Sequence, residues 1–206
     1  MRKLAARAQV SLRAPYEYFG SKAGLIGAIL GEDQMRFRAE TAHRHSLDEL
    51  ENLLDRVQWG IDFFALKQPF YRALSRATQA FTPGHDEEPA RENLRSFQIL
   101  ASRARNAGLI REEIDVGRLG ETLTDIFASN VRTWARESFE IQLVSLKISF
   151  GFAAVLAGVA TKPADERMRA HILEFQRAID AFPSSLLAEG DSSPPAKDMQ
   201  PAAADA

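Results

Sequence analysis

Residues 2–22, RKLAARAQVSLRAPYEYFGSK, predict two short helices joined by a tight turn and followed directly by a longer helix. Residues 2–8 contain strong helix formers and neither Pro nor Gly. Ser11 can cap the second helix, and Pro15 then lies in its first turn, where a missing backbone N–H does little harm. A helix pair with so tight a turn can place its second helix in the major groove of DNA.

The charge distribution supports DNA binding by this segment. Residues 1–45 carry eight Lys or Arg residues and four acidic residues, whereas the whole chain has a net charge of −2. The positive charge is therefore concentrated where DNA would lie.

The end of the second helix is also marked in the sequence. Gly20 can end this helix in a left-handed conformation, Ser21 can cap the next helix, and Lys22 stands at their junction.

The order of these motifs resembles the TetR family of one-component transcriptional regulators. The resemblance rests on V-S at the turn, P-Y-x-Y-F in the second helix and G-S-K-x-x-L opening a longer helix, and it covers Leu4 to Leu30. It implies a dimeric all-helical repressor whose DNA-binding head releases operator DNA when a small molecule binds the larger body. The family usually has Gly where this chain has Gln9, which needs a left-handed or otherwise tolerated backbone. The family's head also has a helix before this motif, so we expect that first helix to be missing here, through a downstream start codon or a truncation.

The candidate DNA-contacting residues are Ser11, Leu12, Arg13, Tyr16, Tyr18 and Lys22. The first three are expected to begin the recognition helix, where Arg13 can bond a guanine or a phosphate. The two tyrosines could offer hydroxyls to phosphates, as the matching positions do in the resembled family, or could belong to the core. Lys22 would meet the DNA backbone. Leu4, Val10, Phe19 and Leu25 are interpreted as packing residues.

Composition sets the class of protein. The chain has 206 residues, 45% of them hydrophobic and 26% charged, and no Cys, which excludes disulfides, thiolate metal sites and a Cys nucleophile. No signal peptide is recognisable, and residues 141–160 contain polar interruptions typical of a buried helix, so we expect a cytoplasmic protein without a membrane span. His43 and His45 point to different sides of a helix, and a solvated loop is the simpler interpretation of His85, so no metal site is predicted.

Helical periodicity continues through the rest of the chain, which predicts an all-α fold. We expect a helix-turn-helix DNA-binding domain with a connecting helix at residues 1–45, a helical ligand-binding and dimerisation body at 46–182, and a disordered tail at 183–206. In the body we expect Pro69 to close a helix, residues 82–89 to form a loop, Gly108 to end the following helix and Asp115 to cap the next.

Two further sets of residues are candidates for ligand binding and dimerisation. A pocket for an apolar or aromatic effector could be lined by Trp59, Phe63, Phe97, Asn130 and Trp134, although for each one taken singly a core position is the simpler interpretation. The dimer interface is expected on the helices 115–138 and 140–160, which the resembled family uses for a four-helix contact. The second of these mixes small residues with Leu143, Leu146, Phe150 and Val155, and a helix buried inside a monomer is the alternative.

Three functions remain open from the sequence. The leading one is a dimeric transcriptional repressor that binds double-stranded operator DNA and responds to a small molecule without a cofactor. The second is a helical interaction or sensor protein that lost DNA binding with its first helix. The third is a small all-α enzyme, for which no Ser-His-acid arrangement, Gly-rich phosphate loop or HExxH motif is present.

Overall fold

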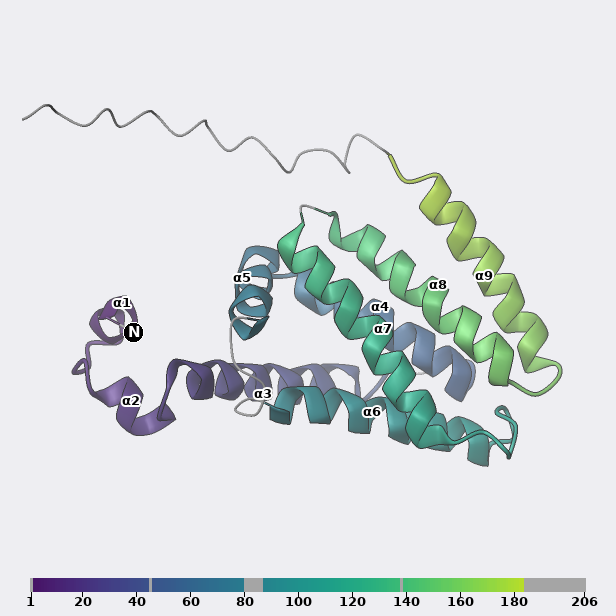
Figure 1. Ribbon diagram of the computed structural model, residues 1–206, viewed down its shortest axis with the longest axis horizontal. Coiled ribbons are helices and arrows are strands. Elements are labelled where there is room, and N and C mark those ends of the chain that lie inside the picture. The colour runs from purple at the N-terminus through teal and green to yellow at the C-terminus, as the bar shows by residue number, and fades with distance from the viewer. Residues whose placement is uncertain (1, 45, 80–86, 138, 184–206) are drawn as a thin grey trace, which may run out of the picture.

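The computed structural model describes residues 2–44, 46–79, 87–137 and 139–183, and over these ranges the protein is all-helical and has no strand (Figure 1). The helices are α1 Arg2–Arg7, α2 Ala14–Phe19, α3 Lys22–Thr41, α4 Glu49–Ala65, α5 Gln68–Gln79, α6 Glu87–Asn106, α7 Val116–Arg136, α8 Ile141–Val159 and α9 Ala164–Asp180. The predicted all-α class is confirmed.

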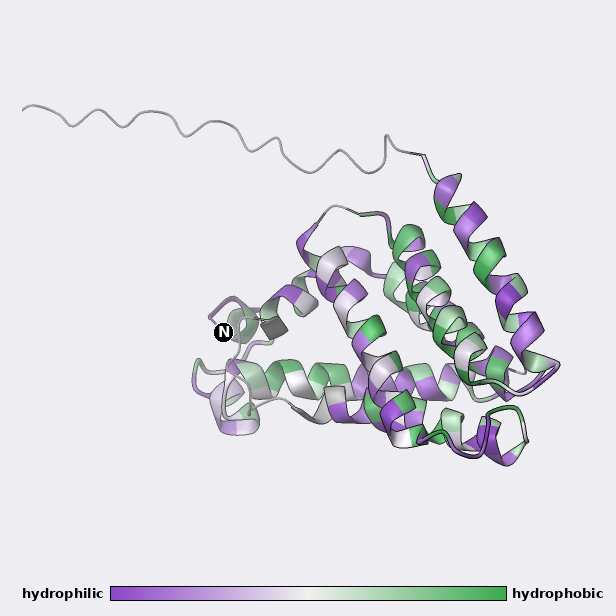
Figure 2. Cartoon of the chain, turned by 45° about the vertical axis from the view of Figure 1, so that its right-hand side comes forward, coloured by the Kyte–Doolittle hydropathy of each residue, from purple (hydrophilic) through white to green (hydrophobic). Residues whose placement is uncertain are grey.

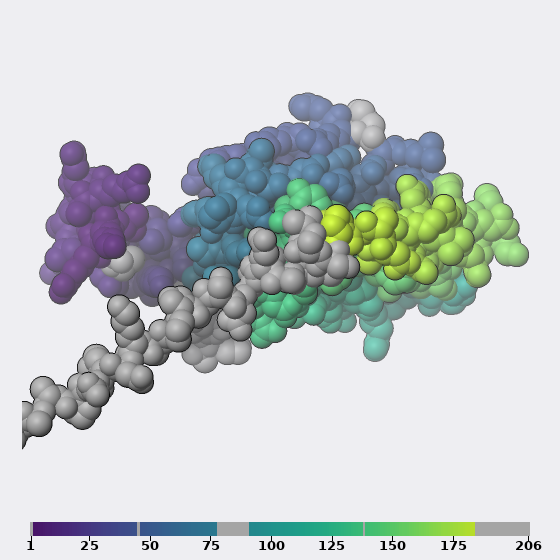
Figure 3. All heavy atoms as spheres, turned by 90° about the horizontal axis from the view of Figure 1, so that it is seen from above, coloured from purple at the N-terminus to yellow at the C-terminus, as the bar shows by residue number. Residues whose placement is uncertain are grey.

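The first two helices lie at one end of the molecule, apart from the others (Figures 1 and 3). α3 leads away from them and packs against α4, α5 and α6. α7 packs against α5 and α6, and α8 is covered by α4, α7 and α9. α3 is therefore the element that joins the N-terminal pair to the larger group of helices.

Local signals fix the boundaries of the N-terminal helices. Gln9 takes a left-handed backbone with φ of 54°, and Gly20 ends α2 with φ of 67° while its N–H donates to the Tyr16 carbonyl at 2.8 Å. The Ser21 hydroxyl caps α3 by accepting from the Gly24 N–H at 2.9 Å. The Ser11 hydroxyl accepts from the Ala14 N–H at 3.1 Å. α2 itself begins only at Ala14, later than predicted, so Ser11, Leu12 and Arg13 precede it.

The helix boundaries of the body follow the predictions with two corrections. Gly108 follows α6 with φ of 73°, and the Asp115 carboxylate caps α7 by accepting from the N–H groups of Gly117 and Arg118 at 2.8 and 3.1 Å. Pro69 lies in the first turn of α5 and does not close α4, because the chain already ends α4 at Ala65. α6 begins inside the predicted loop 82–89, whose first part lies outside the described residues, as does the predicted tail from residue 184 onward.

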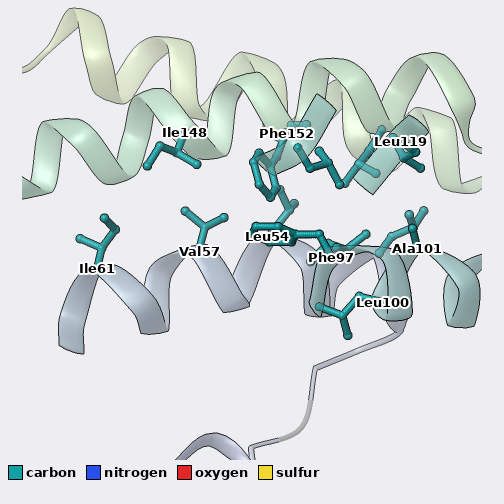
Figure 4. Close-up of a cluster of buried hydrophobic side chains, with 14 of the residues drawn as sticks. Leu54, Val57, Ile61, Phe97, Leu100, Ala101, Leu119, Ile148 and Phe152 are labelled. Carbon is teal, nitrogen blue, oxygen red and sulfur yellow. The ribbon is translucent and has the colours of Figure 1, made fainter. Parts of the chain in front are cut away.

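The hydrophobic core lies between α4, α6, α7 and α8. Leu54, Val57 and Ile61 of α4 face Ile148 and Phe152 of α8 (Figure 4). Each is at most 5% exposed, and burying a side chain of this size stabilises the fold by about 1.5–3 kcal/mol. These contacts hold α4 and α8 together as the centre of the body.

α8 is apolar along most of its length (Figure 2). By length and composition this helix could cross a membrane, yet 56% of its most apolar stretch is buried inside the molecule. Its polar Ser145 is buried too, and the hydroxyl donates to Gln58 Oε1 of α4 at 2.8 Å. The covering helices and this satisfied hydroxyl agree with the predicted core helix.

Candidate nucleic-acid interface and ligand cavity

The N-terminal segment presents all six candidate DNA contacts to solvent. Ser11, Leu12, Arg13, Tyr16, Tyr18 and Lys22 are exposed. Tyr16 is 50% exposed and Tyr18 83%, so neither tyrosine is a core residue. We refer to these tyrosines together with the exposed Arg13 and Lys22 as the basic aromatic surface of the N-terminal pair.

Arg13 and Lys22 flank α2 in the sequence. Arg13 stands immediately before α2, and its Nε lies 2.8 Å from Glu17 Oε1 in an exposed ion pair whose arginine side chain is 85% accessible. A pair this exposed contributes at most about 1 kcal/mol, so the guanidinium can exchange Glu17 for another anion. Lys22 is the first residue of α3, where the positive end of the helix dipole adds to its charge.

The expectation that Leu4, Val10 and Phe19 are packed is wrong for this structure. They are 41%, 47% and 39% exposed, and in the same segment the buried side chains are Ala5 and Pro15. Leu25, by contrast, is partly buried. The N-terminal pair therefore carries an exposed apolar surface beside its basic one.

A cavity of about 480 Å³ lies between α3, α4, α5, α6 and α7. Its apolar wall is mainly aromatic and contains Phe37, Phe63, Phe64, Phe97 and Phe127. The Phe37 and Phe63 rings meet edge to face with centroids 5.7 Å apart. A cavity of this size and lining suits one small apolar or aromatic molecule.

Polar side chains line the cavity on the side of α3. The Tyr71 hydroxyl of α5 donates to Asp33 Oδ2 of α3 at 3.0 Å, and burial together with this hydrogen bond raises the pKa of Tyr71. Arg38 of α3 forms an ion pair with Glu92 of α6. α3 is thus tied to α5 and to α6 by side chains that line the cavity.

Two of the five predicted ligand contacts, Phe63 and Phe97, line this cavity. Trp134 is fully buried behind the wall, where its ring stacks on Phe64 with centroids 6.4 Å apart. Trp59 lies under the Arg44 guanidinium, 5.3 Å from the ring centroid.

Asn130 is also absent from the residues that line the cavity, and its side-chain amide donates to the Ile126 carbonyl of its own helix at 2.8 Å. Sequence reasoning missed the charged residues of the wall, Asp33, Arg38, Arg56, Glu92 and Arg132. The available signal was the spacing of Leu30, Asp33, Phe37 and Arg38, which places charges within an otherwise apolar face of α3.

The four candidate interface residues of α8 lie at different depths. Leu143 is 3% exposed within the single chain and is a core residue, whereas Leu146, Phe150 and Val155 are partly buried. A Cβ added to Gly151 would lie 3.0 Å from Ile126 Cγ2 of α7, so this small residue allows close packing inside the chain.

Comparisons with protein-family models, with curated proteins and with solved structures found no match. The resemblance to TetR regulators therefore stays a prediction from the motif residues. A functional assignment must rest on the two surfaces described above, the basic aromatic surface of the N-terminal pair and the cavity beside α3.

Proposed function

We propose that this protein is a ligand-responsive DNA-binding transcriptional regulator, a repressor released from its operator by a small molecule. The observation that carries the proposal is the position of α3. Its first residue, Lys22, belongs to the basic N-terminal surface, and its middle, including Asp33 and Phe37, lines the cavity. One continuous helix thus connects the two surfaces that the function requires.

The chemistry of the N-terminal surface supports the DNA-binding half of this proposal. Arg13, held only by an exposed pair, can bond a guanine edge or a phosphate. Tyr16, Tyr18 and Lys22 offer exposed donors suited to phosphates on either side of the second helix. A helix pair of this kind reads a half-site, so the proposal includes a homodimer that associates through α7 and α8. The proposal also includes a cytoplasmic location.

The cavity supports the ligand-responsive half. A ligand in the cavity can alter DNA binding only if α3 has two arrangements and the ligand binds one of them more tightly than the other. Asp33, Phe37 and Arg38 of α3 line the cavity, so a bound molecule would contact this helix directly. Coupling between such sites is typically about 1–3 kcal/mol, and it must act equally in both directions.

A sensor that does not bind DNA is the second candidate. It is favoured by the exposure of Leu4, Val10 and Phe19, which leaves the N-terminal pair weakly packed and suits a surface that contacts another protein. A ligand in the same cavity would then control binding to a partner protein instead of binding to an operator.

Selection from a pool of random duplex DNA, followed by gel-shift titration at several salt concentrations, separates the two candidates. The regulator should enrich a roughly palindromic sequence. Lys22→Ala should weaken binding to all sequences and reduce the salt slope by about one, whereas Arg13→Ala should cost about 1–3 kcal/mol and relax one base position if it reads a base. Arg118→Ala, an exposed arginine on α7, is the matched control. Weak binding without sequence preference by the unmodified protein would favour the sensor.

A further inference from the structure

The charged residues of the cavity wall are not all paired. The Asp33 carboxylate accepts from Tyr71 at 3.0 Å and lies 3.8 Å from Arg36 Nη1. The Glu92 carboxylate pairs with Arg38, and its second oxygen lies 3.8 Å from Arg95 Nη1. Both acidic side chains of the wall are thus already engaged by groups of the protein.

Arg56 of α4 has no such partner. Within the described ranges, no carboxylate or carbonyl forms an ion pair or hydrogen bond with its guanidinium, which lies over the Phe37 ring at 5.2 Å from the centroid. Its side chain is partly buried and lines the cavity. The pKa of Arg56 is lowered, first by burial and then by the positive charges of Arg38 and Arg103.

These observations describe a positive charge that the surrounding side chains do not neutralise. An arginine stays protonated in proteins, so this partly buried guanidinium cannot avoid the cost of removing its charge from water by losing a proton. The cation–π contact with Phe37 compensates only part of it, typically about 0.5–2 kcal/mol. An anion entering from the cavity would supply the missing partner.

We infer that the cavity binds a small aromatic carboxylate, whose ring contacts the phenylalanine wall and whose carboxylate pairs with Arg56. This inference rests on the proposed function, because it names the class of effector for the same cavity. The planar guanidinium matches a carboxylate with two parallel N–H···O bonds. A phosphate monoester carries close to two charges. Arg56 alone balances these poorly, because Arg38 of the same wall is paired with Glu92 and Arg132 is exposed to solvent.

The test compares matched ligands on the purified full chain by calorimetry. Benzoate, naphthoate and biphenylcarboxylate are each titrated beside the corresponding primary amide, which keeps the ring and removes the charge, and beside the corresponding sulfonate. We expect at least one carboxylate to bind at least about tenfold more tightly than its amide. Arg56→Met should reduce that ratio to about one, Arg56→Lys should retain part of it, and Arg118→Met should leave it unchanged.

Each outcome bears on the inference. Arg56→Met replaces an unpaired cation by an apolar chain of similar length, so its melting temperature should be no lower than that of the unmodified protein, and a folded variant makes the ratio interpretable. Amides that bind as tightly as carboxylates, sulfonates that bind more tightly, or no binding at millimolar concentration would each overturn the carboxylate assignment. Carboxylate binding that depends on Arg56 but leaves operator affinity unchanged would support the assignment and overturn the proposed regulator.

Discussion

Removal of the Tyr71 hydroxyl is expected to weaken the attachment of α5 to α3. The Tyr71 residue is 5% exposed, and its hydroxyl donates to Asp33 Oδ2 at 3.0 Å, in a site where the Asp33 side chain is 15% exposed. A hydrogen bond to a charged group contributes about 1.5–3 kcal/mol, and water can replace little of it at this depth. Arg36 still lies 3.8 Å from Asp33 in the variant, so we expect Tyr71→Phe to lower the free energy of unfolding by about 1.5–2 kcal/mol.

Urea unfolding of the two proteins measures this difference, and its pH dependence identifies the cause. The pKa of Tyr71 is raised above its ordinary value of 10.0, first by burial and then by the hydrogen bond to Asp33. Below pH 10 the tyrosine is neutral in both states, and its stabilising contribution is fully present. As the pH rises further, only the unfolded chain ionises, so the unmodified protein loses about 1.4 kcal/mol per pH unit that Tyr71→Phe does not lose.

Tyr18→Phe is the matched control, because Tyr18 is 83% exposed. Its free energy of unfolding should stay within about 0.5 kcal/mol of that of the unmodified protein at neutral pH. A Tyr71→Phe variant as stable as the unmodified protein would refute the hydrogen bond as a stabilising contact. So would a stability difference that does not shrink above pH 10.

Three further predictions concern the cavity, its reporter and the assembly. A Cβ added to Gly60 would have one neighbouring atom, the Phe37 Cζ at 4.0 Å, so Gly60→Ala should stabilise α4 by about 0.5–1 kcal/mol. Gly60→Leu should instead fill part of the cavity and weaken the binding of aromatic ligands measured by calorimetry. Trp134 stacks on Phe64 of the cavity wall, so a ligand that weakens operator binding should also change tryptophan fluorescence, and Trp134→Phe should remove most of that change. Light scattering should give about twice the 22.9 kDa chain mass, and Phe150→Glu should shift it toward one chain. A folded monomer of the unmodified protein at micromolar concentration would contradict the dimer.

The helix ends that the sequence predicted well are those set by one local interaction. Ser21 and Asp115 cap their helices with their own side-chain oxygens, and Gly20 and Gly108 take the positive φ values expected of them. Gln9 follows the same logic, since the tight turn requires a left-handed residue whichever side chain stands there. These features depend on neighbours within four residues, and such neighbours can be read from the chain itself.

The cavity could not be predicted in the same way because it depends on how five helices meet. Phe63 and Phe97 were found because large aromatic residues are obvious candidates, yet the same criterion selected Trp134, which the packing of α5 and α7 places behind the wall. Arg56 was missed because a lone charge beside a hydrophobic stripe is usually a solvated residue. Only the packed structure shows that its guanidinium lies over Phe37 and lacks an anionic partner among the described residues.

The proposed function also requires that α3 be able to respond to a ligand, and the way it is held is suited to that. Of its 20 residues, only Ile26 and Thr41 are fully buried, and its other apolar contacts with the core come from the partly buried Ile29, Leu30 and Phe37. Two polar connections, from Asp33 to α5 and from Arg38 to α6, also hold the helix, and both residues line the cavity, within reach of a bound molecule. A carboxylate paired with Arg56 would add negative charge close to both connections, and would favour any arrangement of α3 that brings Arg38 nearer and moves Asp33 away. Since α3 is one uninterrupted helix that begins at Lys22, such a displacement would reach the proposed DNA-binding surface without a separate relay.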